Sequence, residues 1–206
     1  VLELAQKADV EFVGIDKLGS YRKDDSYIDK HIKLILDLPL VNVKAISEKN
    51  FSVAIDCVNS TGGIAIPKLL KALGVSVVEL YCDPTGHFPH NPEPLKEHLG
   101  AICEKVVEEK ADFGIVVDPD VDRLAFITEK GEMFGEEYTL VACADYVLRK
   151  TPGNTVSNLS STRALRDVTE KHGGTYTAAA VGEVNVVTAM KSQNAVIGGE
   201  GNGGII

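Results

Sequence analysis

Residues 113–128 have the sequence FGIVVDPDVDRLAFIT, in which two apolar segments enclose an acidic loop. The segments Phe113–Val117 and Leu124–Thr128 are short and rich in apolar and β-branched residues, which indicates buried strands. The loop between them, Asp118–Arg123, carries three carboxylates within five residues. In open parallel sheets, ligands bind beyond the carboxyl ends of the strands. The stretch therefore predicts a buried strand that ends in a charged loop at a ligand site.

Strand-like and helix-like segments alternate around this stretch. The expected strands are Phe51–Val58, Val75–Tyr81, Phe113–Val117 and Leu124–Thr128, and the expected helices are Ile64–Leu73, Leu95–Lys110 and Tyr138–Leu148. Such alternation predicts an α/β fold with a mixed, mainly parallel sheet whose faces are covered by helices.

A second unit of the same kind is expected after Thr151-Pro152-Gly153. Asn154–Asn158 is strand-like, a helix is expected to start near Ser160–Arg163, and Gly173-Gly174 ends it before a further strand. This order repeats that of residues 51–81, so we expect tandem α/β units. The expected division is 1–40, mostly helical, with a helix at Asp29–Leu38; 41–150, the first α/β domain; and 151–206, an incomplete second one.

Composition and charge narrow the function. The chain has 206 residues with 21 Lys and Arg against 30 Asp and Glu, a net charge of −9. This charge argues against nucleic acid as a partner, because phosphate backbones are bound by clustered basic residues. No apolar run approaches the roughly 20 residues that cross a bilayer, so no membrane is expected. The four scattered cysteines are expected to be free thiols, which predicts a cytoplasmic location. The first residue is Val rather than Met, and the last two residues, Ile205 and Ile206, directly follow a glycine-rich loop. We therefore expect this chain to be a piece of a longer protein.

The acidic loop is a candidate metal site. Crowded carboxylates repel one another, and a divalent cation that prefers oxygen ligands relieves the repulsion. The candidate ligands Asp118, Asp120 and Asp122 include no His or Cys, which favours Mg²⁺ or Ca²⁺ over zinc. The guanidinium of Arg123 is shaped to bind a phosphate group beside the metal. Together these residues predict a phosphoryl-transfer site.

The same residues fit other interpretations. A solvated acidic turn is one. An EF-hand is another, since its first, third, fifth and twelfth positions match Asp118, Asp120, Asp122 and Glu129. We reject the EF-hand because Arg123 stands where its sharp turn needs Gly, and because strands flank the loop. A zinc site is not expected either, because the spacing fits no usual zinc motif for these residues: Cys82, His87, His90 and His98.

A glycine-rich segment, Gly198–Gly204, follows the strand-like Asn194–Ile197. Glycines let the backbone approach a ligand closely. The carboxylate of Glu200 and the amide of Asn202 within it could bind vicinal hydroxyl groups.

Taken together, these motifs resemble those of the α-D-phosphohexomutases, the family of phosphoglucomutase, phosphomannomutase and phosphoglucosamine mutase. DPDVDR at 118–123 resembles the family's metal loop, usually DGDxDR, and GGEGNGG at 198–204 resembles its sugar-binding loop, usually GE-x-SG, with Asn202 in place of Ser. Ala180–Glu183 is similar to a turn of the third domain, and the proline-rich stretch Gly86–Pro94 to a loop of the second. The resemblance covers nearly the whole chain.

The resemblance implies an isomerase of carbohydrate metabolism with four domains. A phosphoserine of the first domain exchanges its phosphoryl group with a hexose phosphate, and a bisphosphate intermediate moves phosphate between C1 and C6. By the same resemblance the Mg²⁺ ligands are Asp118, Asp120 and Asp122, the residue that steadies the phosphoserine is Arg123, and the sugar is bound by Glu200, Asn202 and Glu183. The implied partners are the hexose phosphate and the remaining domains of the parent chain. The phosphoserine loop and the fourth domain's phosphate loop are absent here, so we expect no mutase activity from these residues alone.

Two further classes of function remain open. A metal-dependent sugar phosphatase would use Asp118 as its nucleophile, although Asp122 stands where that pattern has Thr or Val. A non-catalytic calcium-binding module is the other.

Overall fold

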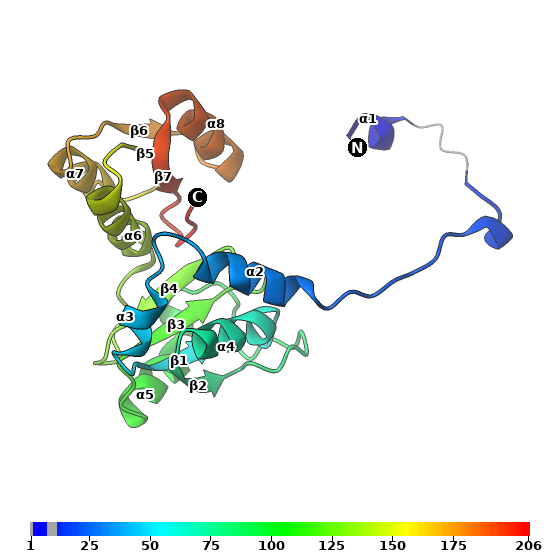
Figure 1. Ribbon diagram of the computed structural model, residues 1–206, viewed down its shortest axis with the longest axis horizontal. Helices are drawn as coiled ribbons and strands as arrows, with labels where there is room; N and C mark the ends of the chain where they lie inside the picture. Colours follow the sequence, from blue (N-terminus) through cyan, green and yellow to red (C-terminus); the bar gives the residue numbers. More distant parts are fainter. Residues whose placement is uncertain (1, 8–11) are drawn as a thin grey trace.

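The computed structural model describes residues 2–7 and 12–206. It consists of two α/β units, with the N-terminal segment running away from them as an arm (Figure 1). The arm contains helix α1 (Leu2–Gln6) and the 3₁₀ helix η1 (Ile15–Lys17), and it leads into helix α2 (Tyr27–Leu36). Residues 12–14 and 18–24 have no regular structure. The prediction of a mostly helical segment was therefore wrong for this part of the arm, because its apolar side chains, such as Phe12 and Leu18, find no surface to pack against and stay exposed.

The first unit contains a four-stranded sheet. Its strands are β1 (Ser52–Asp56), β2 (Ser76–Leu80), β3 (Phe113–Val117) and β4 (Leu124–Ile127), in the order β2-β1-β3-β4. Strand β1 is parallel to β2 and β3, whereas β4 is antiparallel to β3. The sheet is therefore mixed and mainly parallel, as the sequence predicted.

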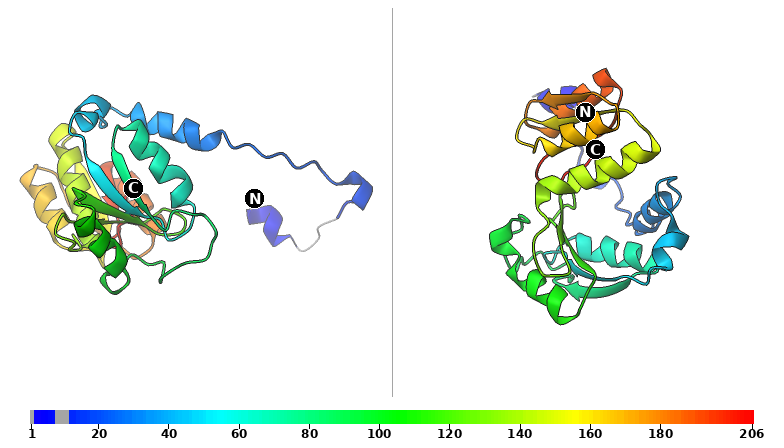
Figure 2. Two further views of the ribbon diagram at one scale, coloured as in Figure 1. Left: turned by 90° about the horizontal axis from the view of Figure 1, so that it is seen from below. Right: turned by 90° about the vertical axis from the view of Figure 1, so that its left-hand side faces the viewer.

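Two helices cover the two faces of this sheet (Figures 1 and 2). Helix α4 (Gly62–Ala72) packs on one face and helix α5 (Gly100–Glu108) on the other, so that each face has its own hydrophobic core. The short helix α3 (Val43–Ser47) precedes the sheet. The single helix expected over residues 95–110 is divided into η2 (Lys96–His98) and α5, because the chain leaves helical geometry at Leu99, whose side chain is buried in the core.

The second unit repeats the strand order of the first. Strands β5 (Asn154–Asn158), β6 (Tyr176–Ala179) and β7 (Ala195–Gly199) form a parallel sheet in the order β6-β5-β7, with helices α7 (Ala164–Lys171) and α8 (Glu183–Gln193) between them. After β7, the backbones of Gly198 and Ile206 exchange antiparallel hydrogen bonds of 3.0 and 2.8 Å, as β3 and β4 do in the first unit. The predicted tandem repeat is confirmed.

Helix α6 (Glu136–Lys150) packs against both units. Its buried Leu140 and Ala144 join Leu165 and Ile197 in the core of the second unit. On the other side, Thr139 Oγ1 donates a 2.9 Å hydrogen bond to the carbonyl oxygen of Leu124 in the first. The domain boundaries expected at residues 40 and 150 stay a prediction. Within the residues that the structure describes, no helix is long and apolar enough to cross a membrane.

Candidate functional site

The loop between β3 and β4 is shaped by its first carboxylate. Asp118 follows β3 directly and is 5% exposed. Its Oδ1 accepts hydrogen bonds from the backbone N–H groups of Asp122, at 3.1 Å, and Arg123, at 3.0 Å. Val121, at the turn, has a φ of 64°, in the left-handed region. The loop therefore closes around the buried carboxylate of Asp118.

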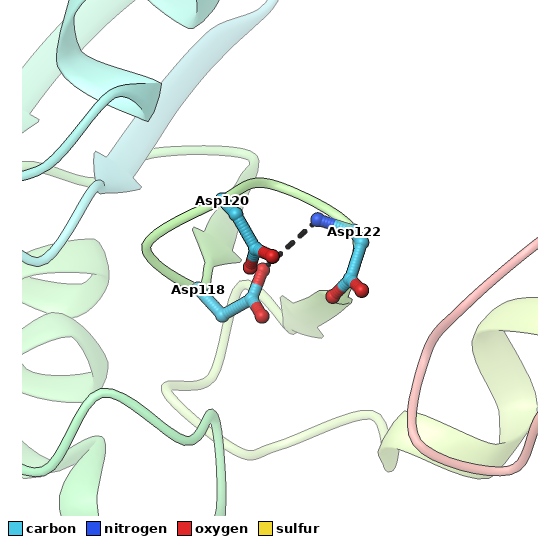
Figure 3. A group of neighbouring side chains, drawn as sticks. All are labelled: Asp118, Asp120 and Asp122. Atoms are coloured by element: carbon cyan, nitrogen blue, oxygen red, sulfur yellow. Dashed lines mark hydrogen bonds between the residues drawn. The ribbon is translucent and has the colours of Figure 1, made fainter. Parts of the chain in front are cut away.

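The three aspartates gather within the curve of this loop (Figure 3). Carboxylate oxygens of Asp118, Asp120 and Asp122 all lie within 4.8 Å of one another. Burial, followed by the neighbouring carboxylates, raises the pKa of Asp118 from 3.8 to about 6, although the N–H of Arg123 opposes this rise. A set of three carboxylates without nitrogen or sulfur donors fits a hard divalent cation such as Mg²⁺ or Ca²⁺.

The turn after β1 supports the acidic loop. Ser60 Oγ and Thr61 Oγ1 donate hydrogen bonds of 2.8 and 2.6 Å to the carbonyl oxygen of Pro119. Strands β1 and β3 are neighbours whose chain connections leave in opposite directions, which is where open α/β sheets bind ligands. The acidic loop thus lies at the switch point of the first sheet.

Arg123 is held between carboxylates. Its Nη1 donates a 2.9 Å hydrogen bond to Oε1 of Glu93, in the proline-rich loop. Its Nε lies 3.9 Å from Asp118 Oδ2 and 3.8 Å from Asp122 Oδ1. The side chain of Arg123 is 33% exposed. It is therefore accessible to an anion while its position is fixed.

The glycine-rich segment of the second unit also places a carboxylate at a strand end. Glu200 follows β7, and its Oε1 accepts hydrogen bonds from Asn158 Nδ2, at 2.8 Å, and the N–H of Gly182, at 3.1 Å. Asn202 Oδ1 accepts the N–H of Gly204 at 3.1 Å, and Asn202 Nδ2 lies 3.5 Å from Glu200 Oε2. The orientations of both side chains are therefore fixed by the second unit.

The two loops meet at the interface of the units. A Cβ atom at Gly203 would lie 2.4 Å from the carbonyl oxygen of Leu124, so only glycine allows this approach. A cavity of about 180 Å³ opens beside the contact. Its lining includes predicted site residues of both units: Asp122, Arg123, Glu183, Glu200 and Asn202. The remaining predicted site residues, Asp118 and Asp120, lie in the same acidic loop as Asp122, outside the cavity lining.

A second cavity, of about 250 Å³, shares part of this lining. It lies between the proline-rich loop, which contributes Glu93, and the second unit, which contributes Ser160. Arg123 and Asn202 line both cavities.

Sequence reasoning missed residues that orient the site. Asn158, 3% exposed, ends β5 and holds Glu200, while its own Oδ1 accepts hydrogen bonds from the hydroxyls of Ser160 and Ser161. A polar residue at the carboxyl end of a parallel strand was the signal that could have found it.

The fold and the site define a class of protein in which two similar α/β units form a ligand site between them. Two tandem α/β units with the same strand order place the loops after their third strands, β3 and β7, on either side of one carboxylate-lined cavity. One loop carries a cluster of carboxylates suited to a divalent cation, and the other carries a carboxylate and an amide among glycines.

Comparison with known proteins gives the family. Residues 25–131 match the family model for phosphoglucomutase/phosphomannomutase, alpha/beta/alpha domain II, and residues 135–206 match that for domain III. The chain belongs to the phosphoglucomutase/phosphomannomutase family. The resemblance stated from the motifs is therefore confirmed.

Individual relatives and solved structures agree with the family models. The chain is 37% identical over 193 residues to a phosphoglucomutase/phosphomannomutase of Thermococcus kodakarensis, covering 93% of this chain and 42% of the relative. It is 32% identical over 201 residues to a phosphoglucomutase of Neisseria gonorrhoeae, covering 93% and 41%. The crystal structure of a phosphoglucomutase/phosphomannomutase family protein from Burkholderia thailandensis superposes with a TM-score of 0.79 at 29% identity, covering 91% of this chain and 40% of that one. The chain thus spans about two fifths of the length of these relatives.

Proposed function

We propose that this chain forms the metal-binding and sugar-binding domains of a magnesium-dependent phosphohexomutase, which moves phosphate between C1 and C6 of a hexose. The observation that carries the proposal is the cavity in which Asp122 and Arg123 of the first unit face Glu183, Glu200 and Asn202 of the second. A phosphate bound at the first unit would have its sugar within reach of the second.

In this proposal Asp118, Asp120 and Asp122 hold Mg²⁺. When bound, the ion would neutralise negative charge on a transferring phosphoryl group, which supplies much of the rate in such chemistry. Arg123 donates further hydrogen bonds to the phosphoryl oxygens, including those of a phosphoserine. Glu93 fixes the guanidinium beforehand, so little orientation is lost when the anion binds.

Glu200, Asn202 and Glu183 bind the hexose hydroxyls. The carboxylate of Glu200 accepts hydrogen bonds, and its orientation is set by Asn158 and Gly182 before any sugar arrives. Asn202 can both donate and accept. Glu183 begins α8, is exposed, and lines the same cavity.

The rest of the catalytic machinery is proposed to belong to further domains of a parent chain. In the proposal a domain that ends near residue 40 supplies the phosphoserine, and another supplies a phosphate loop. Residues 41–150 and 151–206 are the second domain and part of the third. The 206 residues alone are expected to convert no glucose 1-phosphate to glucose 6-phosphate in a coupled assay, and measurable conversion would refute this. A cytoplasmic location is also proposed.

Magnesium titration tests the metal site. Calorimetry should detect binding of Mg²⁺ to the wild-type chain near pH 7.5, and Asp120→Ala should abolish it, because one of three carboxylate ligands is lost. Asp25→Ala is the matched control, since Asp25 is an exposed carboxylate in the arm, where it pairs with Lys23. Equal affinities in wild type and Asp120→Ala would show that the loop is not the site.

The same preparation separates the other two classes of function. A sugar phosphatase would release inorganic phosphate from glucose 6-phosphate in the presence of Mg²⁺, and Asp118→Asn would stop the release. A calcium module would bind Ca²⁺ and show no change in the NMR signals of the glycine-rich segment on addition of glucose 6-phosphate. The proposed function predicts no phosphate release and shifted signals for residues 198–204.

A further inference from the structure

A buried hydrogen-bonded pair joins the carboxyl group of Asp56 to His90 of the proline-rich loop, away from the predicted site residues. Asp56 ends β1 and is 1% exposed. Its Oδ1 accepts the N–H of Val58 at 2.9 Å, and its Oδ2 lies 3.0 Å from Nε2 of His90. A carboxylate buried this deeply is costly unless its oxygens are hydrogen-bonded, so His90 is needed to satisfy it.

His90 is oriented by the loop in which it lies. Its Nδ1 is 2.7 Å from the carbonyl oxygen of Asn91, which can only accept, so Nδ1 carries a proton. The hydrogen bond between Nε2 and Asp56 then needs one further proton, whichever of the two groups holds it. The ring also makes an edge contact with Tyr81, at 5.8 Å between centroids. His90 is therefore fixed at three points.

From this anchor a path of hydrogen bonds leads to the guanidinium of Arg123. Asn91 Oδ1 accepts the N–H of Glu93 at 3.0 Å, which sets the turn that carries Glu93. Glu93 Oε1 then accepts Nη1 of Arg123 at 2.9 Å. The path joins Asp56, at the end of β1, to Arg123, in the loop after β3, through the proline-rich loop.

The path matters because Arg123 has competing partners. Its Nε lies 3.9 Å from Asp118 and 3.8 Å from Asp122. Without Glu93, the guanidinium is free to turn fully onto these carboxylates, where it would neutralise metal ligands and turn away from the cavity that it lines. The hydrogen bond from Glu93 opposes that movement.

We infer that Asp56 and His90 are positioning residues for Arg123: they anchor the proline-rich loop so that Glu93 holds the guanidinium toward an incoming phosphate. The inference rests on the proposed function of Arg123 as a phosphate-binding group. It assigns Asp56 and His90 an effect on anion binding rather than on folding alone.

The test is an NMR titration of the 206-residue chain with glucose 6-phosphate at saturating Mg²⁺. Arg123→Gln should weaken binding at least tenfold. His90→Ala and Asp56→Ala should each weaken binding about three- to tenfold. The double variant His90→Ala with Glu93→Gln should bind glucose 6-phosphate no more weakly than the weaker of the two single variants, because both residues act through Arg123. Asp56→Asn should stay within twofold of wild type, since the amide can still accept from Val58 and donate to His90.

Two controls separate positioning from stability. Ile127→Val shortens a fully buried core side chain and should lower the melting temperature without changing the affinity. Asn91→Ala alters an exposed residue, so it should fold even if His90→Ala does not, and it should still weaken binding.

The possible outcomes are distinct. If Arg123→Gln binds as well as wild type, or wild type does not bind, the proposed function of Arg123 fails. The positioning inference is overturned if Arg123→Gln weakens binding but the other variants match wild type. Those variants are Asn91→Ala, Glu93→Gln and every folded variant of Asp56 and His90. If Asp56→Asn is as weak as Asp56→Ala, the hydrogen-bonded path is not the cause.

Discussion

Replacing Asp118 by Asn should stabilise the metal-free chain, although it removes a proposed metal ligand. The side chain is 5% exposed, and its Oδ1 accepts two backbone N–H groups. Asparagine keeps that oxygen and nearly the same shape. Its amide can donate to the carboxylates of Asp120 and Asp122, whose oxygens lie within 4.8 Å. The substitution thus removes one buried charge and little else.

The size of this gain in stability follows from the pKa of Asp118. Burial and the neighbouring carboxylates raise the pKa of Asp118 from 3.8 to about 6. Between these values the folded state binds a proton that the unfolded chain has lost, so the free energy of unfolding falls as the pH rises from about 4 to about 6 and is then constant. At 1.36 kcal/mol per pH unit, the full loss is about 3 kcal/mol. Asp118→Asn avoids it, and we expect the variant to be about 1–3 kcal/mol more stable than wild type at pH 7.5 without metal.

Magnesium should reverse the order of stability of wild type and Asp118→Asn. A cation that binds only the folded state adds about 2.7 kcal/mol at a concentration 100-fold above its dissociation constant. Wild type should gain this stabilisation and Asp118→Asn should gain little. Urea unfolding, followed by circular dichroism at several pH values with EDTA or with Mg²⁺, measures both effects.

The control for this experiment is Asp25→Asn, the same change at an exposed carboxylate, which should match wild type under all conditions. A metal-free Asp118→Asn less stable than wild type at pH 7.5 would refute the burial argument. An equal response to Mg²⁺ in both proteins would refute the assignment of Asp118 to the metal site.

Other predictions concern the packing that supports the site. Gly63→Ala places a Cβ 2.0 Å from the backbone oxygen of Cys82, so α4 must shift; urea unfolding should show a loss of more than about 2 kcal/mol. Gly100→Ala, at the first residue of α5 with no atom within 4 Å of the added Cβ, should be neutral or stabilise by up to about 1 kcal/mol, and equal effects of the two changes would contradict the steric argument. Ile127→Ala empties a fully buried position in the first core and should cost about 2–5 kcal/mol in the same assay, so a cost below 1 kcal/mol would show that the core collapses around it.

The local pattern of apolar residues predicted helices and strands well where that pattern reflected burial. Strand β3 has the bounds expected from the sequence, Phe113–Val117, because all five residues are buried or half-buried between two helices. The antiparallel direction of β4 was not assigned from the sequence. The six-residue loop Asp118–Arg123 contained the information, since a parallel crossover needs a dozen residues or more. The helical prediction was wrong for part of the arm, because the apolar side chains there have no surface to pack against in the structure.

The site was predictable only within each loop. The crowding of Asp118, Asp120 and Asp122 is visible in the sequence because they are close along the chain. That Glu200 shares a cavity with Arg123 depends on how α6 packs against both units, and no local pattern encodes this. The pairs that orient the site are also distant along the chain, as for His90 and Asp56, 34 residues apart.

The repeat explains how one architecture supports two kinds of ligand site. Asp118 and Glu200 are each the first residue after the third strand of their unit, and backbone N–H groups help to fix both carboxylates: two donate to Asp118 and one to Glu200. They differ in their neighbours. Two further carboxylates crowd Asp118, so its site is suited to a cation. Glu200 instead lies among glycines and beside the amides of Asn158 and Asn202, so its site is suited to neutral hydroxyl groups.

In the proposed function, the number of nearby carboxylates, rather than the fold, therefore determines what each loop binds. Asn202→Asp would place a second carboxylate where the amide nitrogen of Asn202 now lies, 3.5 Å from Glu200 Oε2, and bring the second loop closer to the first in charge. By the same argument, the loop should gain affinity for Mg²⁺ in this variant while it loses affinity for a sugar phosphate. A variant with unchanged affinity for both ligands in parallel calorimetric titrations would mean that the backbone of the loop, and not its charge, selects the ligand.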